Sequence, residues 1–264
     1  MQNKKPWYAR LALILALITP GFLMACALWT KYGVIDWPLG LRAFAMGGMA
    51  LVAITAILAL VSIILIARKP QRTGMGSAIF ALLIPLGIAA YFGPIFAGAS
   101  DHPIHDMATD TATPPPLSEK VMAARAQSGA NAINAYDVPL GQTDQWASAD
   151  APLSQQSYAD IIAASYPELE PLLLGETDPN AAVNAVQMAM AEMGMSNIRF
   201  NEEAGTVEGL AETFWFGFKD DVVARVADGK IDFRSVSRVG ISDLGANAKR
   251  IMDLRQRVAY RLDL

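Results

Sequence analysis

The sequence has one cysteine and two histidines among 264 residues, and only 17% of its residues are charged. The single thiol, Cys26, can form neither an internal disulfide nor a cysteine-rich metal site. Residues 1–100 hold eight lysines and arginines but one acid, whereas residues 101–264 hold thirteen bases and 24 acids. Nucleic-acid binding requires clustered positive charge, which the acidic second part lacks. We therefore exclude nucleic acid as a partner and expect two parts in two environments.

Three long stretches contain no charged residue, in a chain whose mean hydropathy is +0.29. They run over Leu11 to Thr30, Ala43 to Ala67 and Thr73 to Ser100. Each can cross roughly 30 Å of hydrocarbon as a helix, so we predict a three-helix transmembrane region over residues 1–100, with the lipid bilayer as partner. Prolines inside the spans should kink the helices without breaking them. No span contains Asp, Glu, Lys, Arg or His, so a relay for protons or ions is not expected.

Basic residues beside the spans indicate the orientation. They precede the first span and fill the turn between the second and third: Lys4, Lys5, Arg10, Arg68, Lys69 and Arg72. This predicts a multi-pass inner-membrane protein with a cytoplasmic N-terminus and a periplasmic C-terminal part. The alternative is a cleaved lipoprotein signal, which the run Leu23-Met24-Ala25-Cys26 loosely resembles. Small residues at four-residue spacing favour packing among the spans, or against a second copy or a partner subunit of a membrane complex: Ala43, Gly47, Ala89, Gly93 and Ala97.

The remaining sequence predicts an extended lead-in and a folded domain. Residues 101–157 are rich in Pro, Ala, Thr and Gln, with a short helix after Ser118. Residues 158–264 predict a small periplasmic α+β domain, with a helix over 179–193 and four antiparallel strands near 197–201, 206–214, 221–227 and 230–239. Asp228-Gly229 is a strong hairpin signal. A closing amphipathic helix with Ser242 as its N-cap completes the expected fold, a four-stranded sheet with helices on one face.

Four segments of this second part resemble the family called domain of unknown function 1499. They are DHPIHDMATD (101–110), YPELEPL (166–172), TFWFGFKDD (213–221) and DFRSVSRVGISDLGANAKRI (232–251). The resemblance covers residues 101–264, and the last segment is the most specific. It implies a bacterial envelope or organelle membrane in many cases, and no agreed activity.

Three groups of residues are candidates for function. The first contains possible ligands for a divalent metal just outside the third span: Asp101, His102, His105, Asp106 and Asp110. The second runs from a strand into a helix N-terminus and could hold an anion: Arg234, Ser235, Ser237, Arg238, Ser242, Asp243 and Asn247. For the first group, the alternative is hydrogen-bonded residues that fix the domain against the membrane. For the second, it is pairing of Arg234 and Arg238 with Asp220, Asp221 or Asp232.

The third group is the aromatic run from Phe214 to Phe218, in which Trp215 and Phe216 are candidates for membrane contact. Core packing is the alternative. No complete catalytic set is recognised, so we expect a protein that is not an enzyme and has no cofactor. Its periplasmic domain would bind an envelope component or support the assembly or stability of a membrane complex. The alternative is a metal-dependent hydrolase that acts at the membrane surface through the first group.

Overall fold

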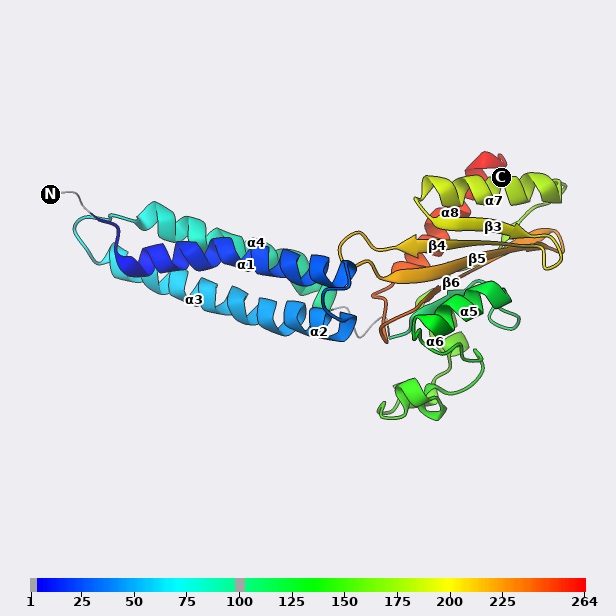
Figure 1. Ribbon diagram of the computed structural model, residues 1–264, viewed down its shortest axis with the longest axis horizontal. Helices are drawn as coiled ribbons and strands as arrows, with labels where there is room; N and C mark the ends of the chain where they lie inside the picture. Colours follow the sequence, from blue (N-terminus) through cyan, green and yellow to red (C-terminus); the bar gives the residue numbers. More distant parts are fainter. Residues whose placement is uncertain (1–3, 98–102) are drawn as a thin grey trace. The chain divides into compact units, whose positions relative to one another are not determined.

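A computed structural model describes residues 4–97 and 103–264. The chain divides into two compact units, one helical and one built on a sheet. Among the described residues, the helical unit comprises 4–97, and the turn Phe214–Gly217 groups with it; the sheet unit comprises the others. Figure 1 shows the helices and strands of each unit.

The helical unit contains three apolar helical rods. The first is α1 (Trp7–Lys31) and the third is α4 (Met75–Ala97). The second is continuous and consists of α2 (Trp37–Arg42), a π-helical turn (Ala43–Gly47) and α3 (Gly48–Ala67). Each rod is long and apolar enough to cross a membrane, which agrees with the three predicted spans. Helix α1 continues through Pro20, and α4 continues through Pro85 and Pro94. Residues 98–100 of the third predicted span lie outside the described residues.

Small side chains allow these rods to pack closely. Four buried alanines form one contact cluster, Ala12, Ala16, Ala59 and Ala81. At Gly48, a Cβ atom would lie 2.3 Å from a terminal methyl group of Leu23, so any larger residue would require this side chain to move. Without a hydrophobic effect between helices in lipid, such backbone proximity supplies much of the packing energy.

The second unit is built on a six-stranded antiparallel sheet, not the four-stranded sheet that we predicted. Its main order is β1 (Asp106–Ala108), β6 (Lys230–Ser237), β5 (Lys219–Ala227), β4 (Thr206–Glu212) and β3 (Ser196–Asn201), and β2 (Leu172–Leu173) also pairs with β6. The four predicted strands correspond to β3–β6. Strands β1 and β2 were missed because runs of three and two residues show no alternation that a sequence pattern can reveal.

Helices cover both faces of the sheet, whereas we predicted one. Adjacent residues of a strand point to opposite faces. Asp220 of β5 binds Arg250 of α8 (Ala246–Arg261), and the next residue, Asp221, binds Arg125 of α5 (Glu119–Gln127). Figure 1 shows α7 (Pro179–Glu192) and α8 on one side of the sheet, and α5 and α6 (Tyr158–Ser165) on the other.

The segment for which an extended lead-in is predicted contributes to this unit. Its described part, 103–157, supplies β1, α5 and three short 3-10 turns, Leu140–Gln142, Asp144–Trp146 and Leu153–Gln155. Tyr136, Leu140 and Trp146 are buried in the same core as Phe233 of β6. As predicted, a helix follows Ser118, whose hydroxyl accepts from the backbone N–H of Val121.

Candidate functional site

The described members of the first group are engaged in separate interactions. Asp106 pairs with Arg234, and Asp110 pairs with Arg225 and Lys230. Asp101 and His102 lie outside the described residues. Within 4–97 and 103–264, no three His, Cys, Asp or Glu side chains are grouped so that they could hold a metal ion. The described geometry therefore lends no support to a metal site or to the hydrolase alternative.

His105 is a buried, hydrogen-bonded side chain. Its Nδ1 donates to the carbonyl oxygen of Ile241 at 3.1 Å, since a carbonyl oxygen only accepts. Burial lowers the pKa of His105, and the charge of Asp106 partly offsets this effect. The ring therefore favours its neutral form inside the domain. The hydrogen bond lies within the sheet unit, and a role in fixing the domain against the membrane stays a prediction.

Arg234, the first arginine of the second group, is inside the domain. Its Nη2 donates to Asp106 Oδ2 at 2.7 Å and its Nε to Asp106 Oδ1 at 3.0 Å. Tyr136 Oη donates to the same carboxylate, and the guanidinium lies over the Tyr136 ring, with 5.4 Å between guanidinium carbon and ring centroid. Only 6% of the Arg234 side chain is exposed. It is therefore a structural arginine that joins β6 to β1.

Asn247 is hydrogen-bonded to both serines of β6 in this group, Ser235 and Ser237. Its Oδ1 accepts from Ser235 Oγ at 2.5 Å, and its Nδ2 donates to Ser237 Oγ at 2.9 Å and to the carbonyl oxygen of His105 at 2.8 Å. Arg250 reaches Ser235 from α8 and binds Asp220 at 2.6 Å. These hydrogen bonds hold the start of α8 against β6.

The predicted N-cap of the closing helix is displaced. Helix α8 begins at Ala246 after Gly245, and Asp243 accepts from the backbone N–H groups of Gly245 and Asn247. Ser242 instead accepts from the N–H of Leu244 before the helix. Burial raises the pKa of Asp243, and the two backbone donors oppose that shift. The backbone donors proposed to bind an anion are therefore occupied by Asp243.

Arg238 is the member of the second group that lines a cleft. Its Nη2 lies 2.7 Å from Asp221 Oδ1, and Arg125 binds the other oxygen of that carboxylate at 2.8 Å. The cleft has a volume of about 310 Å³ and lies between α5 and the strands β3 and β4. Its lining residues are Lys120, Val121, Ala124, Asn197, Ile198, Arg199, Glu208, Gly209, Leu210, Asp221 and Arg238. We call it the α5–β3 cleft.

The α5–β3 cleft combines cationic groups with an apolar wall. Lys120 is exposed and, in the part of the chain that the structure describes, has no ion-pair partner. Arg199 Nη2 lies 2.8 Å from Glu208 Oε2 and 3.0 Å from Ser118 Oγ. With buried Arg125 behind Asp221, the cationic groups outnumber the carboxylates. A volume near the lower limit for small-molecule pockets suits one anionic group with a short apolar portion.

The sequence alone did not reveal this cleft. Asn197, at its edge, has a positive φ of 56° next to an irregularity in the β3–β4 pairing. Such irregularities often redirect side chains near functional sites. The motif Asn197-Ile198-Arg199 carries no recognisable signal of this kind, since β-bulges are not readable from a single strand.

Most of the aromatic run from Phe214 to Phe218 lies in the turn between β4 and β5. Phe214 is 75% exposed and Trp215 is 53% exposed, whereas Phe216 is half-buried. The turn Phe214–Gly217 groups with the helical unit. Membrane contact by Trp215 and Phe216 stays a prediction, and the exposure of Trp215 is compatible with it.

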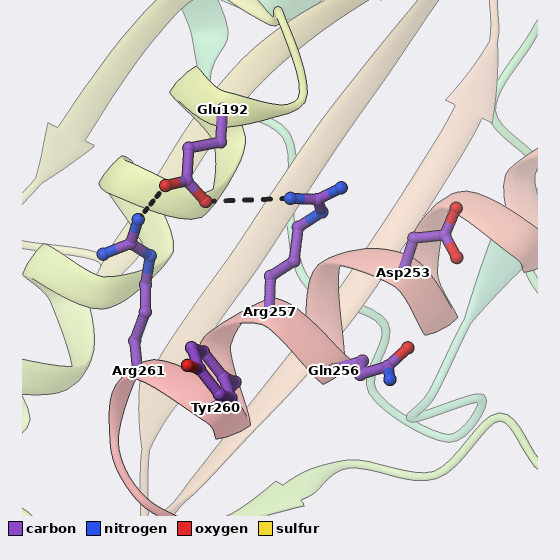
Figure 2. Close-up of a pocket in the computed structure, with 6 residues that line it drawn as sticks. All are labelled: Glu192, Asp253, Gln256, Arg257, Tyr260 and Arg261. Atoms are coloured by element: carbon purple, nitrogen blue, oxygen red, sulfur yellow. Dashed lines mark hydrogen bonds and ion pairs between the residues drawn. The ribbon is translucent and has the colours of Figure 1, made fainter.

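A second hollow lies on the outer side of α7 and α8. Figure 2 shows Glu192 between Arg257 and Arg261, and both arginines pair with it. Lys249 pairs with Asp253 at the same surface. Exposed ion pairs of this kind contribute little free energy and here belong to a solvated helix surface. We therefore consider the α5–β3 cleft the better candidate site.

The comparisons with known proteins agree with the resemblance noted in the sequence. Residues 106–258 match the family described as "Protein of unknown function (DUF1499)". The match runs from β1 into α8, covering more than half of the chain and most of the sheet unit. No curated protein matches the chain, and neither does any solved structure. The chain therefore belongs to this family of unknown function.

Proposed function

We propose that this is a membrane-anchored binding protein whose sheet unit holds an anionic envelope component in the α5–β3 cleft. The supporting observation is the set of basic groups there, Lys120, Arg199 and Arg238, beside the apolar side chains of Ile198 and Leu210. Charge-assisted hydrogen bonds to a carboxylate or phosphate are among the strongest that a protein makes. Retention of such a component would in turn support a membrane complex.

The surroundings of the cleft favour a ligand with a single anionic group. An adjoining hollow shares Lys120, Arg199 and Glu208 with the cleft, and it also contains Glu202 and Glu203. Two further carboxylates repel a polyanion at short range. A nucleic acid or a heavily phosphorylated polymer therefore fits this surface poorly.

Native mass spectrometry of the full chain, released gently from its own membrane, tests the proposal. We expect a mass excess that is retained by the wild type and by Lys249→Glu, and lost from Lys120→Glu. Both lysines are exposed, so neither change should impair folding. An excess that Lys120→Glu keeps would refute the cleft as the binding site. An excess equal to a divalent metal would instead support the hydrolase alternative.

We further propose that the N-terminus is cytoplasmic and the sheet unit periplasmic. The support is the bias of lysine and arginine toward the N-terminus and the turn between α3 and α4. A C-terminal fusion to a phosphatase that is active only in the periplasm should be active. An inactive phosphatase fusion, together with activity of a C-terminal reporter that works only in the cytoplasm, would show the opposite orientation.

A further inference from the structure

Another cavity lies within the helical unit, among residues of the helices that we take to span the membrane. Its volume is about 380 Å³. It is lined by Leu23, Phe44, Gly48, Met49, Val52, Ala53, Ile88, Ala89, Phe92 and Gly93. None of these residues has a polar side chain, so the lining is almost entirely apolar. We call it the α3–α4 crevice.

The crevice exists because small residues leave space beside large ones. A Cβ atom added at Gly93 would meet nothing within 4 Å. The rings of Phe44 and Phe92, both part of the lining, make an edge-to-face contact with 5.4 Å between their centroids. Phe44 belongs to the π-helical turn Ala43–Gly47, and such turns frequently occur at functional sites.

The crevice lies at the depth of the hydrocarbon core of the bilayer. Trp37 begins its rod, and we place it at the membrane interface, where aromatic residues are enriched. With a rise of about 1.5 Å per residue, Phe44 lies roughly 10 Å and Ala53 roughly 24 Å below Trp37. The hydrocarbon core is about 30 Å thick, so these depths include the middle of the bilayer. The crevice therefore lies where acyl chains are the surrounding medium.

Arg42 provides a charge beside the upper end of the crevice. It is exposed, and it lies two residues before Phe44 at the end of α2. An arginine at this depth extends its guanidinium toward the headgroup level while its stem stays in hydrocarbon. The guanidinium is then placed to bind a lipid phosphate.

We propose that the α3–α4 crevice holds one acyl chain of an anionic phospholipid, whose phosphate Arg42 binds. The volume of about 380 Å³ is too small for a helix, since a cylinder about 10 Å wide already encloses roughly 420 Å³ over one 5.4 Å turn. This site is separate from the α5–β3 cleft and does not depend on a ligand there.

Photo-crosslinking with a defined lipid tests this site. The full chain is placed in phosphatidylcholine nanodiscs that contain phosphatidylglycerol with a diazirine midway along one acyl chain, and the adducts are mapped by mass spectrometry. We expect adducts concentrated on the residues that line the crevice. Gly93→Leu should lower their yield about tenfold, equivalent to about 1.4 kcal/mol.

Gly87→Leu is the matched control, because Gly87 lies on the same helix, does not line the crevice and also has nothing within 4 Å of an added Cβ. It should keep the wild-type yield, and so should Lys120→Glu, which separates this proposal from that for the cleft. Equal yields in Gly93→Leu and Gly87→Leu, or adducts spread evenly along α3 and α4, would overturn the acyl site. A probe with a phosphatidylcholine headgroup that labels the crevice equally well would overturn the role of Arg42. A bound polypeptide that blocks labelling would make the crevice a protein interface and would also overturn the proposal.

Discussion

Arg234 and Asp106, which are 128 residues apart in the chain, form a bidentate ion pair. Arg234 Nη2 lies 2.7 Å from Asp106 Oδ2, and Arg234 Nε lies 3.0 Å from Asp106 Oδ1. The pair joins β6 to the short edge strand β1. Asp106 was a candidate metal ligand and Arg234 a candidate anion ligand, and the structure shows that each is the other's partner. A buried charge without its partner is costly, so this pair holds the strand arrangement in place.

Arg234→Met should destabilise the sheet unit strongly, because it leaves the carboxylate of Asp106 buried and uncompensated. We expect a loss of about 3–5 kcal/mol in the free energy of unfolding. Denaturant unfolding of the full chain in detergent, followed by the circular dichroism of the sheet, measures this loss. The double variant Arg234→Met/Asp106→Leu should recover part of it. A single variant as stable as the wild type would contradict a structural role for the pair.

Asn247→Ala should lower the free energy of unfolding by about 2–3 kcal/mol, because it removes three buried hydrogen bonds, to Ser235, to Ser237 and to the carbonyl oxygen of His105. The same denaturant titration provides the measurement. Asn180→Ala, on the exposed side of α7, is the control and should change stability little. If both variants unfold alike, the polar cluster does not tie α8 to β6 as we describe.

The stability of the sheet unit should fall as the pH decreases below about 6.5, the ordinary pKa of histidine. Burial lowers the pKa of His105 in the folded protein, so between the lowered value and 6.5 only the unfolded chain takes up the proton. The contribution is fully present above 6.5 and is lost as the pH falls toward the folded pKa. Melting temperatures between pH 5 and 7.5 should therefore decline on the acid side. His105→Gln should flatten this decline, and an unchanged pH profile in that variant would assign the effect to other groups.

A fluorescent label at position 215 should show that the turn at Trp215 lies in an apolar environment in the membrane. With Cys26 replaced by serine, a polarity-sensitive bimane attached at Trp215→Cys should emit at shorter wavelength in nanodiscs than in denaturant. The same label at Leu173→Cys, an exposed position of β2, should emit as in water. Identical emission from both positions would show that the turn stays in the aqueous phase.

Local sequence patterns correctly predicted those features of the structure that depend only on residues close together in the chain. The three apolar runs without charge correspond to three membrane-length helices, because a run of that length has few other stable environments. Asp228 and Gly229 both adopt the positive φ that a tight hairpin needs, with values of 50° and 71°. The specific string around Arg234 and Arg238 also identified the family.

Features that join distant segments could not be predicted in this way. β1 has three residues and becomes a strand because β6 supplies its hydrogen-bonding partner. The alternation along β6 indicated an ionic face, but α5 and its flanking segments bury that face, and only the fold brings Arg125 to Asp221.

The sequence by itself therefore determined the membrane region, the hairpins and the family, since these depend on composition, on short-range backbone geometry or on a local string of residues. The tertiary structure alone decided which charges are buried, which arginine lines a cleft, and where an apolar crevice remains between helices. Those properties depend on contacts between residues far apart in the chain, and on the packing of side chains whose neighbours no local pattern specifies.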